Sequence, residues 1–335
     1  MKIKYIDLFC GIGGFRFAAD VTFTQHGTEP LCVFSSDIDE HARKAYYANF
    51  GELPFGDITK INPFDIPDHD ILFAGFPCQP FSIIGNGNGF HDTRGTLFFN
   101  IVNILKAKQP IGFVLENVKR LVSHRQGQTL KTIIQELNKL GYEVDYKVLN
   151  ALDYGLPQKR ERVFIVGFKS NHAIEWPKKI KERLALSDIL EKDVPLNYYA
   201  SEYIKSKRKL AHETKHYPSI WHENKAGNVS SYPYSCALRA GASHNYLLVN
   251  GERRLTPREM LRLQGFPESF KIVVPDAQVR KQAGNAVPVN LVRSVLESCM
   301  PVLKKILSKQ NKESYGLTGR YGRKEIASFA NCRQS

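Results

Sequence analysis

The sequence predicts an α/β fold, with a doubly wound, mostly parallel sheet covered by helices on both faces and a smaller, irregular second domain. In the first half of the 335 residues, short apolar runs alternate with helical patterns, as they do in βαβ units. From about residue 175 this rhythm fails in a stretch rich in Lys, Tyr, Ser, Asn and His, and it returns near Leu255.

Each element has its own signal. The expected strands are apolar runs at Tyr5–Phe9, Leu31–Ser35, Ile71–Phe73, Gly112–Glu116, Tyr142–Leu149 and Val163–Phe168. Helices are expected at Glu40–Phe50, Asn100–Lys108 and Leu130–Leu140, the last one ended by Gly141. Thr256 and Glu259 have the spacing of a capping box, and Pro257 suits the first turn of the helix that follows. A last helix should begin near Pro288, ahead of a basic, weakly patterned tail.

The charge is unevenly distributed along the chain. Residues 1–174 hold 19 Lys and Arg against 18 Asp and Glu, whereas the remainder holds 28 against 15. This asymmetry favours a polyanionic partner for the second half, where the cluster Lys205–Lys209 has aromatic residues nearby: Tyr203, Tyr217, Trp221, Tyr232 and Tyr234. For any single cluster, a solvated basic face is the alternative.

Several classes of protein are disfavoured. The six cysteines are far apart and form no C-x-x-C pair, so we expect neither a metal site nor a disulfide framework, and a reducing cytoplasm fits best. Met1 leads directly into a strand-like segment, and no run of 18 apolar residues exists. We therefore expect no signal peptide and no membrane-spanning segment.

A cysteine between two prolines stands out in the segment Gly75–Ser82, which reads Gly-Phe-Pro-Cys-Gln-Pro-Phe-Ser. The proline rings fix the backbone on either side of Cys78. The apolar run Asp70–Ala74 just before it predicts a buried strand, so Cys78 should follow the carboxyl end of that strand, where α/β sheets bind ligands. An ordinary buried cysteine is the alternative.

Other strand ends carry further candidates. Glu116, in Glu-Asn-Val, should lie on the same rim as Cys78, although a carboxylate that caps a helix is the plainer interpretation. The segment Gln158–Arg162 enters a strand with two guanidinium groups, of which Arg162 could donate to a substrate carbonyl or phosphate. The glycine-rich loop Asp7–Phe15 and the acidic Asp37 and Asp57 suggest a small-molecule site at the same edge.

Together these blocks, with Gly-Asn-Ala-Val-Pro at 284–288, closely resemble the DNA (cytosine-5)-methyltransferases of bacterial restriction-modification systems. The match spans the ordered blocks from Tyr5 to about Leu291. The resemblance implies a class I S-adenosylmethionine-dependent methyltransferase fold. It makes Cys78 the nucleophile on cytosine C6 and Glu116 the partner of N3, with Arg162 and Arg160 completing the catalytic set.

The resemblance also implies cofactor and DNA contacts. S-adenosylmethionine, leaving as S-adenosylhomocysteine, would contact residues from several strand ends: Phe15, Asp37, Ile38, Asp57, Ile58, Pro77, Leu97 and Asn285. Asp37 would bind the ribose, and Asp57 the adenine amino group. Because Asn285 comes late in the sequence, the chain must return to the first domain. The implied division is 1–174 (catalytic and cofactor-binding), 175–250 (target recognition), 251–308 (the returning part) and 309–335 (a basic tail).

The expected partner is double-stranded DNA, bound by a monomer that acts on the same site as a companion endonuclease. The target base would be flipped out of the duplex. Residues 82–95 resemble the loop that closes over the base, and the DNA contacts expected on this resemblance are Ser82, Ile84, Arg94, Arg239 and Asn245.

Other functions fit less well. A transfer-RNA cytosine methyltransferase of the same fold is the main alternative, but its typical Cys-Phe-Thr is absent. A DNA-binding module without catalysis would not need Cys78 between prolines. An amino-methylating enzyme would need a second proline at Asn62–Asp65, and the glycine spacing is wrong for a nicotinamide dehydrogenase.

Overall fold

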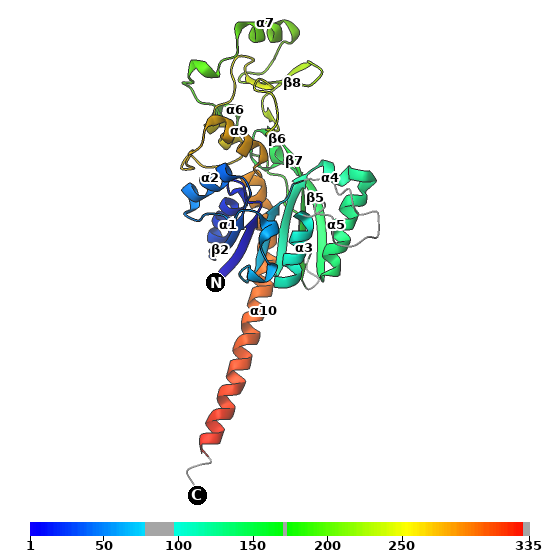
Figure 1. Ribbon diagram of the computed structural model, residues 1–335, viewed down its shortest axis with the longest axis vertical. Coiled ribbons are helices and arrows are strands. Elements are labelled where there is room, and N and C mark those ends of the chain that lie inside the picture. The colour runs from blue at the N-terminus through cyan, green and yellow to red at the C-terminus, as the bar shows by residue number, and fades with distance from the viewer. Residues whose placement is uncertain (78–96, 170–172, 331–335) are drawn as a thin grey trace.

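The computed structural model describes residues 1–77, 97–169 and 173–330, and for residues 310–330 only the course of the backbone (Figure 1). Its strands are β1 (Lys2–Leu8), β2 (Glu29–Ser36), β3 (Ile71–Gly75), β4 (Gly112–Val118), β5 (Tyr142–Asn150), β6 (Gln158–Lys159), β7 (Glu161–Lys169), β8 (Ile220–Glu223), β9 (Val229–Tyr232), β10 (Ser235–Cys236) and β11 (Leu247–Val249). Its α-helices are α1 (Gly14–Gln25), α2 (Glu40–Phe50), α3 (Leu97–Lys108), α4 (Arg120–Ser123), α5 (Gln128–Lys139), α6 (Leu186–Ile189), α7 (Glu202–Ala211), α8 (Pro257–Leu263), α9 (Asp276–Asn285) and α10 (Val289–Ala330).

The central sheet has the strand order β2-β1-β3-β4-β7-β5. All its strands run parallel except β7, which is antiparallel to both of its neighbours. The prediction of a mostly parallel sheet is thus confirmed, and each of the six expected apolar runs forms one of these strands. The order reverses between β1 and β3, and open α/β sheets bind ligands at such a switch point.

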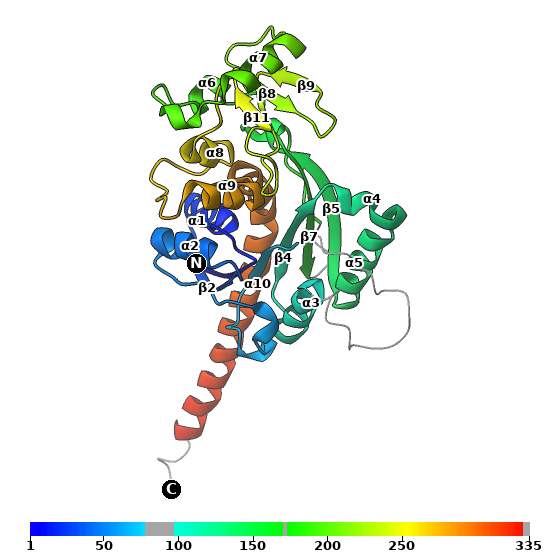
Figure 2. The ribbon, with the colours of Figure 1, turned by 45° about the horizontal axis from the view of Figure 1, so that its top comes forward.

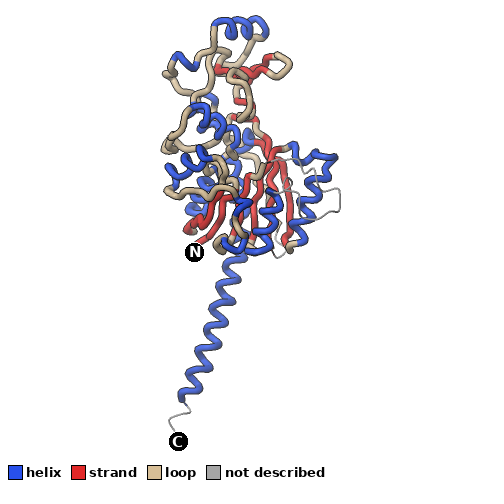
Figure 3. The backbone as a smooth tube through the Cα atoms, in the orientation of Figure 1, coloured by secondary structure: helices blue, strands red, loops and turns tan. Residues whose placement is uncertain are grey.

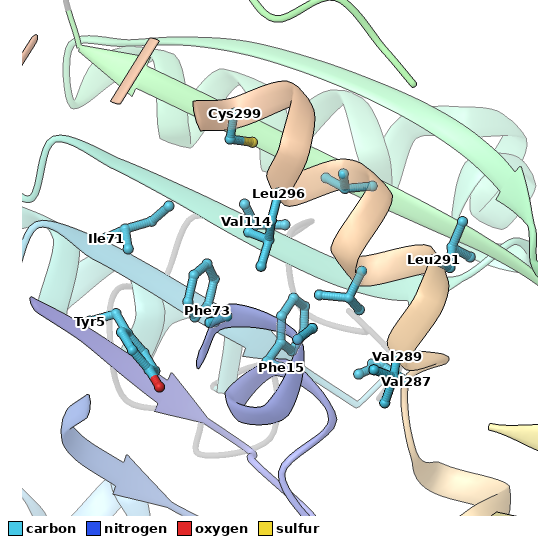
Figure 4. Close-up of a cluster of buried hydrophobic side chains, with 14 of the residues drawn as sticks. Tyr5, Phe15, Ile71, Phe73, Val114, Val287, Val289, Leu291, Leu296 and Cys299 are labelled. Carbon is cyan, nitrogen blue, oxygen red and sulfur yellow. The ribbon is translucent and has the colours of Figure 1, made fainter. Parts of the chain in front are cut away.

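Each face of the sheet buries its own layer of helices. One face packs against α1, α2 and α10 through residues such as Tyr5, Phe73 and Val114 (Figure 4). The other face packs against α3 and α5, where the apolar residues of α5 recur at Leu130, Ile133 and Leu137 on one side of the helix. Strand residues alternate between the two layers because successive side chains point to opposite faces.

The irregular region forms a smaller unit at one end of the molecule (Figures 1 and 2). It contains a three-stranded sheet in the order β11-β8-β9 and the helix α7. Its strands are only three or four residues long, which explains why no period was visible in the sequence. Its apolar core also takes in Leu255, Leu263 and Ala283, so the returning part of the chain packs into it beyond the expected boundary at 250.

The returning part then joins the large domain. Thr256 and Glu259 form the predicted capping box at the start of α8. After α9, the long helix α10 begins at Val289, lies against the sheet and then projects beyond it, so the tail continues as helix to Ala330 (Figure 3). By length and composition alone, the helical segment Asp276–Lys309 could cross a membrane. However, 61% of its most apolar stretch of 18 residues is buried inside the fold, which is typical of a core helix.

Candidate active site

The chemically interesting side chains gather at one edge of the central sheet. Strands β1, β3 and β4 are parallel and end there, while the antiparallel β7 begins there. Gly75 at the end of β3 is opposite Glu116 in β4, and Val118 is opposite Arg162 in β7. The direction of β7 is what brings Gln158–Arg162 to the same rim as the ends of its parallel neighbours.

Glu116 and Arg162 form a buried ion pair at this rim. The Arg162 Nε lies 2.7 Å from Glu116 Oε1, and the two side chains are only 13% and 9% exposed. Burial raises the pKa of Glu116, although Arg162 and then Arg160 act in the opposite direction. A carboxyl group with a raised pKa keeps its proton to a higher pH than usual, which suits an acid that must donate to a base.

Asn117 connects this pair to the cysteine segment, a role that the sequence did not reveal. Its buried Nδ2 donates to Phe76 O at 2.9 Å, two residues before Cys78. The loop leaving β3 is thereby tied to the end of β4. The only signal in the sequence was its place in Glu-Asn-Val.

If the chain catalyses the methyl transfer that its sequence implies, Asn117→Leu should slow that reaction by about 100-fold, because a misplacement of about 1 Å has that cost in an active site. The affinity for the cofactor should change little. Single-turnover rates and equilibrium cofactor binding measure the two effects. An unchanged rate in a folded variant would show that this bond does not position the loop.

Cys78 itself, together with Ser82, Ile84 and Arg94, lies outside the described residues. The description of this segment ends at Pro77, which is exposed just past β3. The roles expected for these four residues therefore rest on the sequence.

The first loop meets the returning chain next to this rim. A Cβ on Gly14 would lie 2.6 Å from Val287 Cγ2 and 3.0 Å from Val287 O, so only glycine permits this contact between α1 and the Gly-Asn-Ala-Val-Pro block. Asn285 is exposed two residues before Val287. A Cβ on Gly11 would meet no atom within 4 Å, so the loop borders open space.

Two carboxylates flank that loop. Asp37 accepts from Gly11 N and Asp39 N, both at 2.8 Å, and burial raises its pKa. The amides of Asp37 and Phe55 pair with Phe55 O and Ser35 O, which brings the segment with Asp57 alongside the end of β2. Hydrogen bonds from the hydroxyl and amide of Thr59 lower the pKa of Asp57. Two acidic groups beside a glycine loop fit the ribose and amino groups of a nucleoside.

The apolar candidates divide between the two faces of the sheet. Ile58 and Leu97 belong to the layer of α3, and Ile38 is 73% exposed. Phe15 belongs to the opposite layer, where it is buried and stacked on Phe73 at 5.4 Å (Figure 4). Phe15 thus packs in a different apolar layer from Ile58 and Leu97, and its expected contact with the cofactor stays a prediction.

Phe9 is an aromatic residue at this rim that the sequence analysis did not include among the candidates for the small-molecule site. It directly follows β1, packs against the layer that contains Ile58 and Leu97, and has a φ of 54°. This φ is uncommon for a residue other than glycine, and such strain often marks functional sites. No signal in the sequence marked this position, because Phe9 is the last residue of the apolar run Tyr5–Phe9.

Arg160 has contacts that the sequence did not predict. It is 1% exposed, and the hydrogen bonds that it donates within the described residues go to the backbone carbonyls of Leu238, Gly284 and Ala286. Burial, and then the neighbouring Arg162, lower its pKa to about 9. These contacts make Arg160 a connector between segments, and a direct catalytic role for it stays a prediction.

The basic cluster Lys205–Lys209 is less available than its sequence suggested. Arg208 is 1% exposed and pairs with Glu223, while Lys205 and Lys209 pair with Glu202 and Glu252. Trp221 is buried as well, whereas Tyr203 and Tyr217 are exposed. Arg208 is therefore unavailable to a polyanion, whereas Lys207 and Lys209 stay exposed, so a polyanion surface at this cluster stays a prediction.

The two residues expected to read base edges lie in the small unit. Arg239 is exposed, with its guanidinium 4.8 Å from the centre of the Tyr246 ring, and Asn245 is half-buried. Within the described ranges, no group of three or more His, Cys, Asp or Glu could hold a metal ion.

Comparisons with known proteins agree with this geometry. Residues 3–301 match the family model of C-5 cytosine-specific DNA methylases. The chain is 60% identical over 301 residues to the type II methyltransferase M.HaeII of Haemophilus aegyptius, covering 89% of this chain and 92% of that protein. It is 58% identical over 299 residues to M.NgoBI of Neisseria gonorrhoeae, covering 88% and 92%.

Solved structures share the fold at low identity. The Dnmt2 methyltransferase of S. pombe has a TM-score of 0.69 and 23% identity, covering 90% of this chain and 99% of that one. A mutant DNMT2 of Spodoptera frugiperda has a TM-score of 0.70 and 20% identity, covering 89% and 99%.

Proposed function

Because the chain belongs to the C-5 cytosine-specific DNA methylase family and is a DNA (cytosine-5) methyltransferase, we propose that it methylates one cytosine of a short duplex sequence through a covalent bond to Cys78. The observation that carries this mechanism is the buried Glu116–Arg162 pair, opposite the end of the strand that leads to Cys78.

The chemistry starts from a poor nucleophile, since C5 of cytosine does not attack a methyl donor by itself. The Cys78 thiolate adds to C6 while the Glu116 carboxyl gives its proton to N3, and the ring becomes an enamine that is nucleophilic at C5. When bound, S-adenosylmethionine supplies the electrophilic methyl group, which C5 takes up. A water molecule then takes the C5 proton, which re-forms the 5,6 double bond and expels Cys78 as a thiolate, and N3 returns its proton to the Glu116 carboxylate.

Arg162 positions the acid in this scheme. Its Nε faces Glu116 Oε1 at 2.7 Å, which fixes the orientation of the carboxyl group, while burial keeps the pKa of Glu116 above its usual range. Arg162 also supports the exocyclic edge of the base. No atom of a stacked cytosine is accessible to these groups, so the base must be flipped out at a cost of about a few kcal/mol.

The glycine loop, with open space beside Gly11, and the two carboxylates fit S-adenosylmethionine. Asp37 would accept from the ribose hydroxyls and Asp57 from the adenine amino group. The remaining contacts would come from residues around the same rim: Phe9, Ile38, Ile58, Pro77, Leu97 and Asn285. The product would be S-adenosylhomocysteine.

The type II methyltransferase relatives support DNA as the substrate and a place in a restriction-modification system. Within that role we propose a cytoplasmic monomer that needs no metal and protects sites cut by a companion endonuclease. The small unit would recognise the target sequence, with Arg239 and Asn245 at base edges and Ser82, Ile84 and Arg94 contacting the DNA near the flipped base.

The test measures transfer of labelled methyl groups to duplex DNA and, separately, to transfer RNA. We expect methylated cytosines at one duplex sequence, which sequencing of the product identifies. Methylation of transfer RNA with none in duplex DNA would overturn the proposal in favour of an RNA cytosine methyltransferase.

A further inference from the structure

Two side chains at the start of β7 hold the segment Ser235–Ala240 of the small unit. They are Gln158 and Arg160, both buried. With Arg162 they occupy alternate positions of one extended run, so their side chains point to the same face. Arg162 is at the cytosine end of this series and Gln158 at the other, about 13 Å away at the usual rise of a strand.

Gln158 contacts two segments. Its Oε1 accepts from Leu238 N at 3.0 Å, and its Nε2 donates to Leu263 O at 2.8 Å. Both polar atoms of this fully buried amide are therefore used, which makes its position strict.

Arg160 binds the carbonyl group of Leu238, the residue whose amide group binds Gln158. Its Nη1 donates to Leu238 O at 2.8 Å, while Nη2 donates to Gly284 O at 2.9 Å and Ala286 O at 2.8 Å. Burying a guanidinium group is costly, and apolar packing could join these segments without that cost. The rigid, planar guanidinium group of Arg160 instead fixes the relative positions of the segments that it joins.

Backbone contacts complete the junction. Strands β6 and β10 pair in parallel, with Ser235 opposite Gln158 and Cys236 opposite Lys159. A Cβ on Gly284 would lie 2.3 Å from Ala240 N, so α9 and the segment Ser235–Ala240 touch main chain to main chain. The segment is thus confined between the catalytic strand and the block that contains Asn285.

The next residue, Arg239, faces outward. It is exposed, its amide donates to Tyr246 Oη at 2.9 Å, and its guanidinium lies over the Tyr246 ring. An arginine presented in this way can bind guanine O6 and N7 in the major groove. Its position relative to Glu116 is set through Leu238, Arg160 and Arg162.

We propose that Gln158 and Arg160 are positioning residues that fix the distance between the base-reading segment and the cytosine pocket, so that sequence recognition selects which base reacts. This proposal depends on the DNA methyltransferase function given above. It assigns to these two side chains a role in discrimination between DNA sequences, beyond their role in packing.

The experiment uses the full-length protein and the site mapped for the wild type. For wild type, Gln158→Met and Arg160→Lys, kcat/KM is measured on duplexes with the mapped site and with one base pair of it altered. One wrong base pair normally lowers the affinity for a DNA site by about 5- to 150-fold. The discrimination ratio is kcat/KM on the mapped site divided by kcat/KM on the altered site. For Gln158→Met we expect this ratio to fall by about tenfold, with the KM for S-adenosylmethionine within about twofold of wild type. Arg160→Lys should lower the ratio in the same direction.

The matched control is Gln264→Met. Gln264 is also fully buried, and among the described residues its side chain donates to the backbone carbonyl of Ala283 and not to Leu238. It removes one side-chain hydrogen bond where Gln158→Met removes two, so it should lower the melting temperature by less, and it should keep the discrimination ratio. If Gln158→Met slows all duplexes equally, the two residues only hold the fold and the proposal is overturned. A wild-type protein that methylates no duplex would instead refute the DNA methyltransferase function, which is a separate outcome.

Discussion

Replacing Cys78 by alanine should lower the single-turnover rate of methyl transfer by about 10⁴-fold or more, as loss of a covalent nucleophile does in other enzymes. Without a thiolate at C6, the cytosine ring stays aromatic and C5 cannot attack. Binding of the duplex should persist, because contacts to phosphates and base edges do not use the sulfur. Labelled methyl transfer and filter binding measure the two properties on the same preparation.

A second cysteine provides the control for this experiment. Cys299 lies on α10 and is fully buried in the apolar layer between that helix and the sheet (Figure 4). Cys299→Ala should cost stability through a small cavity and leave the transfer rate within about threefold. A Cys78→Ala enzyme that kept a tenth of its rate would show that the reaction does not need this thiol.

Glu116→Gln should lower the rate by about 10²- to 10⁴-fold, the usual contribution of a positioned acid. The amide is nearly isosteric and can still form hydrogen bonds, but it cannot give a proton to N3. Because burial raises the pKa of Glu116, the wild-type acid should stay protonated to a higher pH than an exposed glutamate. Its rate should then fall as the pH rises through that raised pKa.

The pH dependence separates the two groups. The Cys78 thiolate becomes more abundant as the pH rises, so the wild-type profile should rise and then fall. Glu116→Gln should keep the rising limb and lose the falling one. The control Glu161→Gln changes a half-buried glutamate that pairs with Lys119, and its profile should match the wild type. A falling limb that persists in Glu116→Gln would assign that proton to another group.

The parts of the fold that the sequence predicted are those with local signals. The run Ile71–Phe73 is apolar throughout because both faces of β3 are buried, and Thr256 with Glu259 forms a capping box within four residues. No local sequence signal predicts that β7 runs antiparallel to its neighbours. It depends on pairing with β4 and β5, and it explains why a motif that precedes a strand lies at the same rim as motifs that follow strands.

The contacts of Arg160, Phe9 and Phe15 involve residues that are distant in the sequence. Arg160 looks like a catalytic cation until the carbonyls of Leu238 and Gly284 are placed around it. Phe9 and Phe15 flank the same glycine loop, and only the packing shows that they belong to opposite layers of the sheet. Residue type and spacing gave the chemistry of the rim, whereas the assignment of each side chain needed the three-dimensional contacts.

The most direct test of the mechanism is to trap the covalent intermediate. A duplex with 5-fluorocytosine at the mapped target has no C5 proton to lose, so Cys78 cannot be expelled after methylation. With S-adenosylmethionine present, we expect one protein–DNA adduct that carries the added methyl group, linked through the peptide that contains Cys78. An adduct on another residue, or methylation of normal duplexes with no trapped adduct, would contradict the account.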